Sequence, residues 1–200
     1  MPKKIILLAR EREVPFLHDF TASLNKAVEV ISATSMTRFQ KEVRQGLDGV
    51  RLISFLSAFV VPQDVLKRLT LTPYNVHPGP PERPGLFPDA FAAIQGAREF
   101  GVTVHEMTCR VDAGLIVDVK RFALPPHATR LEIQDHAERF AVQLFAMLVR
   151  HCAFEDEDLK PNGEQWSGTC TTRQDYELLL EQYDCLRTPS DVSVLRSFRS

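Results

Sequence analysis

Residues 5–9 read Ile5-Ile6-Leu7-Leu8-Ala9, an unbroken apolar run that is followed by an amphipathic segment at 14–26. The pattern returns with a short, mostly apolar stretch at 28–31, a polar helical segment at 35–47 and a further apolar run at 50–56. Short apolar runs that alternate with helices predict parallel strands buried under helices on both faces of a sheet. We therefore predict an α/β, Rossmann-like fold with a mostly parallel, twisted sheet, whose reactive groups gather at the carboxyl ends of the strands.

The pattern continues for one more helix and strand and then breaks. A short helix is expected at 63–69 and a fourth strand at 74–77. Residues 78–88 contain five prolines and two glycines, which is typical of a rigid loop rather than a helix or strand. A short helix is expected at 89–96.

Two extended segments follow, at 102–108 and 115–124, and they are expected to add antiparallel strands to the sheet. Thr129 and Glu132 form a capping-box pattern, in which each side chain bonds the backbone N–H of the other residue. The apolar residues after it are spaced to bury one face of a long helix.

We expect the chain to divide into a domain at 1–155, which contains the candidate catalytic residues considered below, and a C-terminal tail at 156–200. The start of the tail is acidic and irregular, and Thr171 or Thr172 is expected to cap one short helix in it. The polar residues from Pro189 are expected to fray.

Composition excludes several function classes. A net charge of -2 gives no general attraction to nucleic acid or to membranes. The four cysteines lack CxxC spacing, so neither a zinc site nor any other metal is expected. The longest apolar stretch, at 52–62, is far shorter than the roughly 20 residues of a membrane span, and residues 1–9 lack the features of a secretory signal. We expect a cytoplasmic protein.

Asn75 and His77 are two positions apart on the fourth predicted strand, so they project from the same face at its carboxyl end. Asp112 lies in a Val-Asp-Ala-Gly turn, where a carboxylate is exposed. An amide and an imidazole can stabilise the oxyanion formed in acyl transfer, and a histidine beside a carboxylate can move the proton. By spacing alone, most such residues are structural.

Two longer motifs carry a family resemblance. The stretch 74–85, Tyr-Asn-Val-His-Pro-Gly-Pro-Pro-Glu-Arg-Pro-Gly, resembles the first signature of the 10-formyltetrahydrofolate-dependent formyltransferases. Residues 101–107 and 110–114 resemble the second signature, Gly-Val/Thr-x-x-His followed by Asp-x/Ala-Gly. Both occur in the family's order and separation, and residues 54–62 resemble the strand and loop whose backbone holds the pterin.

The resemblance implies the formyltransferase fold, 10-formyltetrahydrofolate as formyl donor and a metal-free reaction. It implies Asn75, His77 and Asp112 as the catalytic residues. The residues that it implies for the folate site are Ala58, Phe59, Val60, His105, Thr108, Arg110 and Val111. For His105, a structural role as a buried strand histidine is as well supported as a catalytic one.

Two features of known formyltransferases that this sequence lacks limit which molecule can accept the formyl group. The loop after the first predicted strand, at 9–13, is not the Gly- and Ser-rich phosphate loop of glycinamide ribonucleotide formyltransferases. Too few residues follow Leu124 for the barrel-like domain of methionyl-tRNA formyltransferases, so no nucleic acid partner is expected. The sequence is most similar to small stand-alone formyltransferase-like proteins and to the formyltransferase-like part of a hydrogenase maturation protein.

We therefore expect formyl transfer to a primary amine of a small molecule, such as an amino sugar. Two alternatives remain: hydrolysis of 10-formyltetrahydrofolate, and a non-catalytic folate-binding subunit. The extended segment 115–124 also allows pairing across a homodimer.

Overall fold

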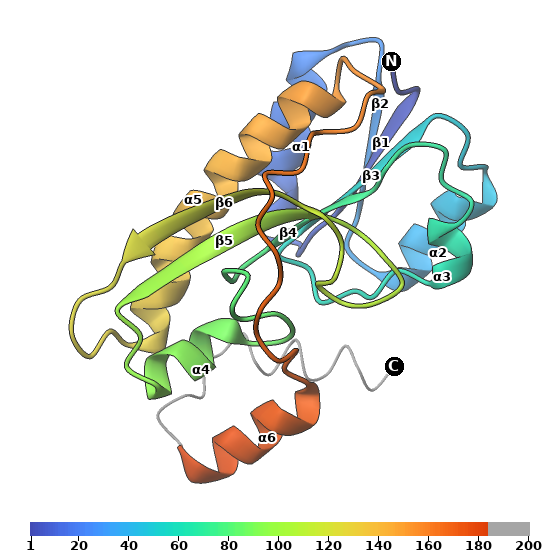
Figure 1. Ribbon diagram of the computed structural model, residues 1–200. Coiled ribbons are helices and arrows are strands. Elements are labelled where there is room, and N and C mark those ends of the chain that lie inside the picture. The colour runs from blue at the N-terminus through green and yellow to red at the C-terminus, as the bar shows by residue number, and fades with distance from the viewer. Residues whose placement is uncertain (184–200) are drawn as a thin grey trace.

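A computed structural model describes residues 1–183, so the segment from Pro189 that was expected to fray lies outside the described residues. Its centre is a six-stranded sheet with the order β2-β1-β3-β4-β5-β6 (Figure 1). The strands are β1 (Lys4–Leu8), β2 (Glu29–Ala33), β3 (Val50–Phe55), β4 (Tyr74–His77), β5 (Glu99–Glu106) and β6 (Ile116–Ala123). The first four run parallel, whereas β5 and β6 are antiparallel additions. The predicted α/β, mostly parallel sheet and its antiparallel extension are confirmed.

Helices cover both faces of the sheet and one of its ends. They are α1 (Val14–Leu24), α2 (Met36–Arg44), α3 (Gln63–Leu66), α4 (Pro88–Ile94), α5 (Arg130–Cys152) and α6 (Arg173–Gln182). Helices α1 and α5 lie against one face and α2 and α3 against the other, while α4 and α6 lie together at the end of the sheet where β4 leads into its loop (Figure 1). None of the helices in residues 1–183 is long and apolar enough to span a membrane.

The larger core lies between the sheet and α5. Leu144, Phe145 and Leu148 of α5 are fully buried, as are Val76 of β4 and Val104 of β5. Burial of side chains of this size contributes roughly 1.5–3 kcal/mol each. This core holds β4 and β5 rigidly together, and these two strands carry the candidate site.

Helix boundaries differ from the prediction where local backbone geometry decides them. The predicted helix 35–47 is shorter, because Ser35 is the N-cap and the chain turns out of the helix at Gly46, with a left-handed φ of 116°. Strand β5 begins before the predicted start at Val102, because residues 99–101 pair with the end of β6.

The predicted N-terminal caps of α5 and α6 are confirmed. Thr129 and Glu132 form the predicted capping box at the start of α5. Of the two threonines considered for the tail helix, Thr172 is the N-cap of α6, where it forms a second capping box with Asp175.

Residues 156–172, called the strap here, connect α5 to α6 without regular structure. Figure 1 shows this segment, in orange, running from the end of α5 across the sheet to α6. Its start is anchored by Arg51, which is fully buried, donates to the carbonyl of Asp156 at 2.9 Å and lies 3.4 Å from the carboxylate of Asp158. The Tyr74 hydroxyl accepts a bond from the backbone N–H of Leu159 at 2.9 Å. The strap is therefore tied to the same strand that carries Asn75.

Candidate active site

Asn75 and His105 are neighbours across the antiparallel pair formed by β4 and β5. Directly opposite residues in such a pair project from the same face of the sheet. Nδ2 of Asn75 accordingly lies 3.1 Å from Nε2 of His105. The register of the two strands, rather than spacing along the chain, brings His105 into the site.

Asp112 reaches the same place from the turn after β5. Its Oδ2 lies 3.2 Å from Nδ1 of His77, and its Oδ1 lies 3.1 Å from Nε2 of His105. The backbone N–H of Gly85 donates to Oδ2 at 2.7 Å. Asp112 holds a left-handed φ of 43°, a conformation that costs energy for a non-glycine residue and is concentrated at functional sites. The carboxylate is thus fixed between two imidazoles and a backbone donor.

Both imidazoles have the same arrangement of partners. Nε2 of His77 lies 3.0 Å from the carbonyl oxygen of Arg83, and Nδ1 of His105 lies 2.8 Å from that of Glu106. A nitrogen that faces a carbonyl must carry the proton, because a carbonyl can only accept. In the neutral form of each ring, the remaining lone pair therefore faces Asp112.

Burial sets the charge of this group. Burial in the protein lowers the pKa of His77, although Asp112 and the Arg83 carbonyl oppose the shift, so that ring is neutral near pH 7. Burial alone would raise the pKa of Asp112. In the acid range where Asp112 titrates, the charge of protonated His77, the bond from protonated His105 and the Gly85 N–H outweigh this burial and lower that pKa to about 2. At neutral pH the site holds an ionised carboxylate with a basic nitrogen beside it.

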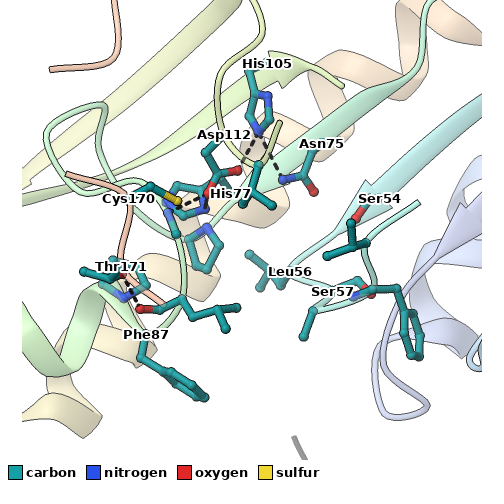
Figure 2. A pocket seen from close by; sticks show the side chains of 18 of the residues that line it. Ser54, Leu56, Ser57, Asn75, His77, Phe87, His105, Asp112, Cys170 and Thr171 are labelled. Atoms are coloured by element: carbon teal, nitrogen blue, oxygen red, sulfur yellow. Dashed lines mark hydrogen bonds and ion pairs between the residues drawn. The ribbon is translucent and has the colours of Figure 1, made fainter. Parts of the chain in front are cut away.

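A cavity of about 400 Å³ opens onto this cluster. In Figure 2, Asn75, His77, His105 and Asp112 lie together at one wall, with Ser57 on one side of the opening and Phe87 and Thr171 on the other. The Oδ1 atom of Asn75 is buried and has no hydrogen-bond partner. A buried, unsatisfied amide next to a cavity is a feature that a polar ligand would complete.

One half of the cavity matches the folate residues implied by the sequence. All seven line it: Ala58, Phe59, Val60, His105, Thr108, Arg110 and Val111. Leu56, Leu66 and Met107 add apolar surface to the same half. This half can accept a flat, partly apolar group against the backbone of two loops.

The other half of the cavity lies at the ends of α4, α5 and α6. It is lined by Phe87 before α4, by Arg130, Gln134 and Glu138 of α5, and by Arg173 of α6. Arg130 is buried, donates to Asp89 at 2.5 Å and to the Tyr176 hydroxyl at 2.7 Å, and lies over the rings of Phe87 and Tyr176. This half is polar and charged, unlike the half lined by Leu56, Leu66 and Met107.

Sequence reasoning did not place Trp166 in the site. Its ring lies 5.7 Å from that of His77 and 5.0 Å from that of His105, at angles of 74° and 89°. Its indole N–H donates to the carbonyl of Gly114 at 2.9 Å. No pattern around Trp166 in the sequence signals contact with the histidines. Within residues 1–183, no three His, Cys, Asp or Glu side chains are grouped as potential metal ligands.

Known structures share this architecture. An N-formyltransferase from Helicobacter canadensis, solved with folinic acid and dTDP-3-aminofucose, superposes with a TM-score of 0.64 at 17% identity, covering 88% of this chain and 72% of that one. A 4-N formyltransferase from Francisella tularensis gives a TM-score of 0.68 at 21% identity, covering 88% and 78%. HypX from Aquifex aeolicus gives 0.61 at 22% identity, and this chain, 88% covered, matches only 32% of its length.

The family assignment comes from the sequence match. Residues 22–149 match the family model described as formyl transferase. The matched region contains β4, β5, the proline loop and the turn of Asp112, so it includes every residue of the hydrogen-bonded cluster. The chain belongs to the formyl transferase family.

Proposed function

We propose that this protein transfers the formyl group of 10-formyltetrahydrofolate to the primary amine of a small acceptor, such as an amino sugar. One observation carries the proposal: Asn75, His105, Asp112 and His77 form a continuous polar cluster between two chemically different halves of one cavity. Two halves suit two substrates that must meet at one reactive centre.

The folate half suits the donor. Its apolar lining and loop backbone can hold a pterin ring, and a relative of the same fold binds folinic acid. Asn75 lines the same cavity, and we assign to its amide nitrogen a hydrogen bond to the formyl oxygen of the bound donor. An amide nitrogen in that position stabilises negative charge on this oxygen, and one such donor contributes about 3 kcal/mol to the transition state.

The reaction needs two bond changes and one proton transfer. The acceptor nitrogen forms a bond to the formyl carbon and gives a tetrahedral intermediate with negative charge on oxygen. That intermediate collapses when the bond from the carbon to N10 of the folate breaks. The acceptor nitrogen loses a proton and N10 gains one, so the products are the formamide and tetrahydrofolate.

Between its loss from the acceptor nitrogen and its transfer to N10, the proton is held by the cluster of Asn75, His77, His105 and Asp112. Asp112 is ionised, and the free lone pair of His77 faces it. We assign to this pair the acceptance of the amine proton, which is held on Nδ1 of His77 against the carboxylate and is then donated to N10 as the bond from N10 to the formyl carbon breaks. His105, with its Nε2 between Asn75 and Asp112, aligns the oxyanion donor with the proton acceptor.

The acceptor half supports an amine substrate over water. Hydrolysis would need no second binding region, yet this half presents Gln134, Glu138 and Arg173 to the cavity. These groups can bond hydroxyl and charged groups of a sugar derivative. The N-formyltransferase from Helicobacter canadensis, which has the same fold, was solved with a nucleotide-linked amino sugar, dTDP-3-aminofucose. A folate-binding subunit without catalysis would have no chemical need for the paired imidazoles and carboxylate.

The decisive experiment compares matched acceptors. The protein is incubated with 10-formyltetrahydrofolate and a panel of free, phosphorylated and nucleotide-linked amino sugars, each beside the same sugar with its amine acetylated. Tetrahydrofolate release and formamide formation are followed together. Equal amounts of the two products, seen only with a free amine, support transfer. Tetrahydrofolate release at the same rate with blocked acceptors, without a formamide, would mean hydrolysis.

A further inference from the structure

The single tryptophan of the chain contacts the candidate site from outside the cavity. Trp166 packs against the rings of His77 and His105, as described above. It is absent from the residues that line the cavity. Its indole N–H also holds the carbonyl of Gly114, in the turn that presents Asp112. One side chain therefore touches both histidines and the turn of the carboxylate.

Trp166 lies beyond the region that matches the family model, residues 22–149. The strap that carries it is nevertheless fitted to the proline loop at 78–88. The N–H of Ser167 donates to the carbonyl of Pro81 at 3.1 Å. Gly168 packs so closely on Glu82 that a Cβ at this position would collide with the Glu82 carbonyl.

Further along, the strap bonds the part of the loop that serves the site. The N–H of Thr171 donates to the carbonyl of Pro84 at 3.0 Å, and the Thr171 carbonyl accepts from Leu86 at 3.0 Å. Gly85, between these two bonded residues, gives Asp112 its N–H donor, and Arg83, directly before Pro84, gives His77 its carbonyl partner. The strap thus fixes both the rings and the loop that orients them.

We propose that Trp166 is a positioning residue that holds His77 and His105 in their orientation toward Asp112; this inference rests on the proposed function. Aromatic rings at near right angles are a favourable arrangement, and the indole also fills the space behind the imidazoles that water would otherwise enter. Loss of the indole frees both rings to rotate and hydrates them. Because small displacements of reacting groups strongly reduce rate, turnover falls while substrate binding, on the opposite side of the rings, is preserved.

The test compares three substitutions of the strap. Trp166→Leu keeps apolar bulk without the ring, Trp166→Phe keeps a ring without the N–H, and Glu164→Gln removes a strap ion pair with Arg121 that is remote from the cavity. We expect Trp166→Leu to lower kcat by about tenfold or more with KM for both substrates nearly unchanged. Trp166→Phe should recover most of that loss, and Glu164→Gln should behave as wild type. Equal kcat in the Leu variant and wild type would overturn the inference.

A second measurement does not depend on turnover. The ring current of Trp166 shifts the proton resonances of nearby imidazoles. Burial is the main cause of the lowered pKa of His77, and the indole packs against that ring. NMR of the histidine rings in Trp166→Leu should show changed shifts and a raised pKa for His77. Unchanged ring shifts and titration would refute the positioning role even if no acceptor amine is found. Absence of formyl transfer by the wild-type protein would instead refute only the proposed function.

Discussion

His77 and His105 face opposite oxygens of one carboxylate: Nδ1 of His77 lies 3.2 Å from Oδ2 of Asp112, and Nε2 of His105 lies 3.1 Å from Oδ1. Each ring has its other nitrogen on a backbone carbonyl. A nitrogen that faces a carbonyl carries a proton, so the position of that proton is fixed in each ring, and the other nitrogen of each ring faces Asp112. The site thus places two imidazole nitrogens beside one carboxylate, and that of His105 also contacts Asn75.

Replacing the carboxylate tests this arrangement most directly. An Asp112→Asn variant keeps the shape of the side chain but cannot stabilise a positive imidazole. We expect kcat for formyl transfer to fall by roughly 10³–10⁴, the scale of loss when a carboxylate that orients a catalytic histidine becomes an amide. Steady-state kinetics with the acceptor found by the amine panel gives the number, and circular dichroism checks the fold.

Asp135→Asn is the matched control for that variant. Asp135 is an exposed carboxylate of α5 that pairs with Arg139 on the same helix, four residues on. The Asp135→Asn substitution should leave kcat unchanged. Activity of Asp112→Asn within tenfold of the control would contradict the proposed proton path.

Asp112 also makes a pH-dependent contribution to stability. Its pKa in the folded protein, about 2, is below the ordinary value of 3.8. The ionised form therefore stabilises the fold above pH 4, and that contribution is lost as the pH falls from about 4 to 2. The shift corresponds to about 2 kcal/mol.

Urea unfolding from pH 7 down to pH 2 measures this contribution. The free energy of unfolding of the wild type should fall more steeply below pH 4 than that of Asp112→Asn, and the two curves should converge toward pH 2. Parallel curves over this interval would show that Asp112 is not the carboxylate responsible.

Much of the fold is predictable because residues close together in the sequence determine it. The strand at Tyr74–His77 has the predicted bounds, since the apolar positions of a buried strand stand out from the proline loop that follows. The same strand places Asn75 and His77 on one face by simple alternation. The capping box at Thr129 was equally local.

The rest of the site depends on contacts that no local pattern encodes. His105 meets Asn75 because β4 and β5 pair in one particular antiparallel register, and only the family resemblance connected Asp112 with the strand. Trp166 is still further from the histidines along the chain. It lies in a strap without helical or strand periodicity, so its sequence neighbourhood carries no signal of what it packs against.

Because the strap packs closely on the proline loop, a methyl group added at Gly168 should reduce both stability and turnover. In Gly168→Ala the new Cβ would collide with the Glu82 carbonyl, a backbone atom that cannot rotate away. We expect the variant to lose roughly 1–3 kcal/mol of stability, as overpacked sites do. Its kcat should also fall, because the strap is lifted from the loop that orients His77.

Ser167→Ala is the control for that methyl group. The adjacent Ser167 is exposed and bonds Pro81 through its backbone N–H, which the substitution keeps. Thermal unfolding and steady-state kinetics should show a lower melting temperature and a lower kcat for Gly168→Ala than for Ser167→Ala. If Gly168→Ala melts and turns over like Ser167→Ala, the strap is not held as closely as the structure indicates.

The buried amide of Asn75 gives the sharpest distinction between binding and catalysis. Its Oδ1 has no partner, and its Nδ2 contacts His105. Asn75→Ala removes the donor for the oxyanion, so we expect kcat to fall by about 10²–10³. The affinity for a stable folate analogue should change little, because the formyl oxygen is weakly charged before the amine attacks. Isothermal titration with folinic acid and single-turnover kinetics measure the two quantities separately. A loss of folate affinity that accounts for the whole loss of rate would make Asn75 a binding residue and remove it from the proposed chemistry.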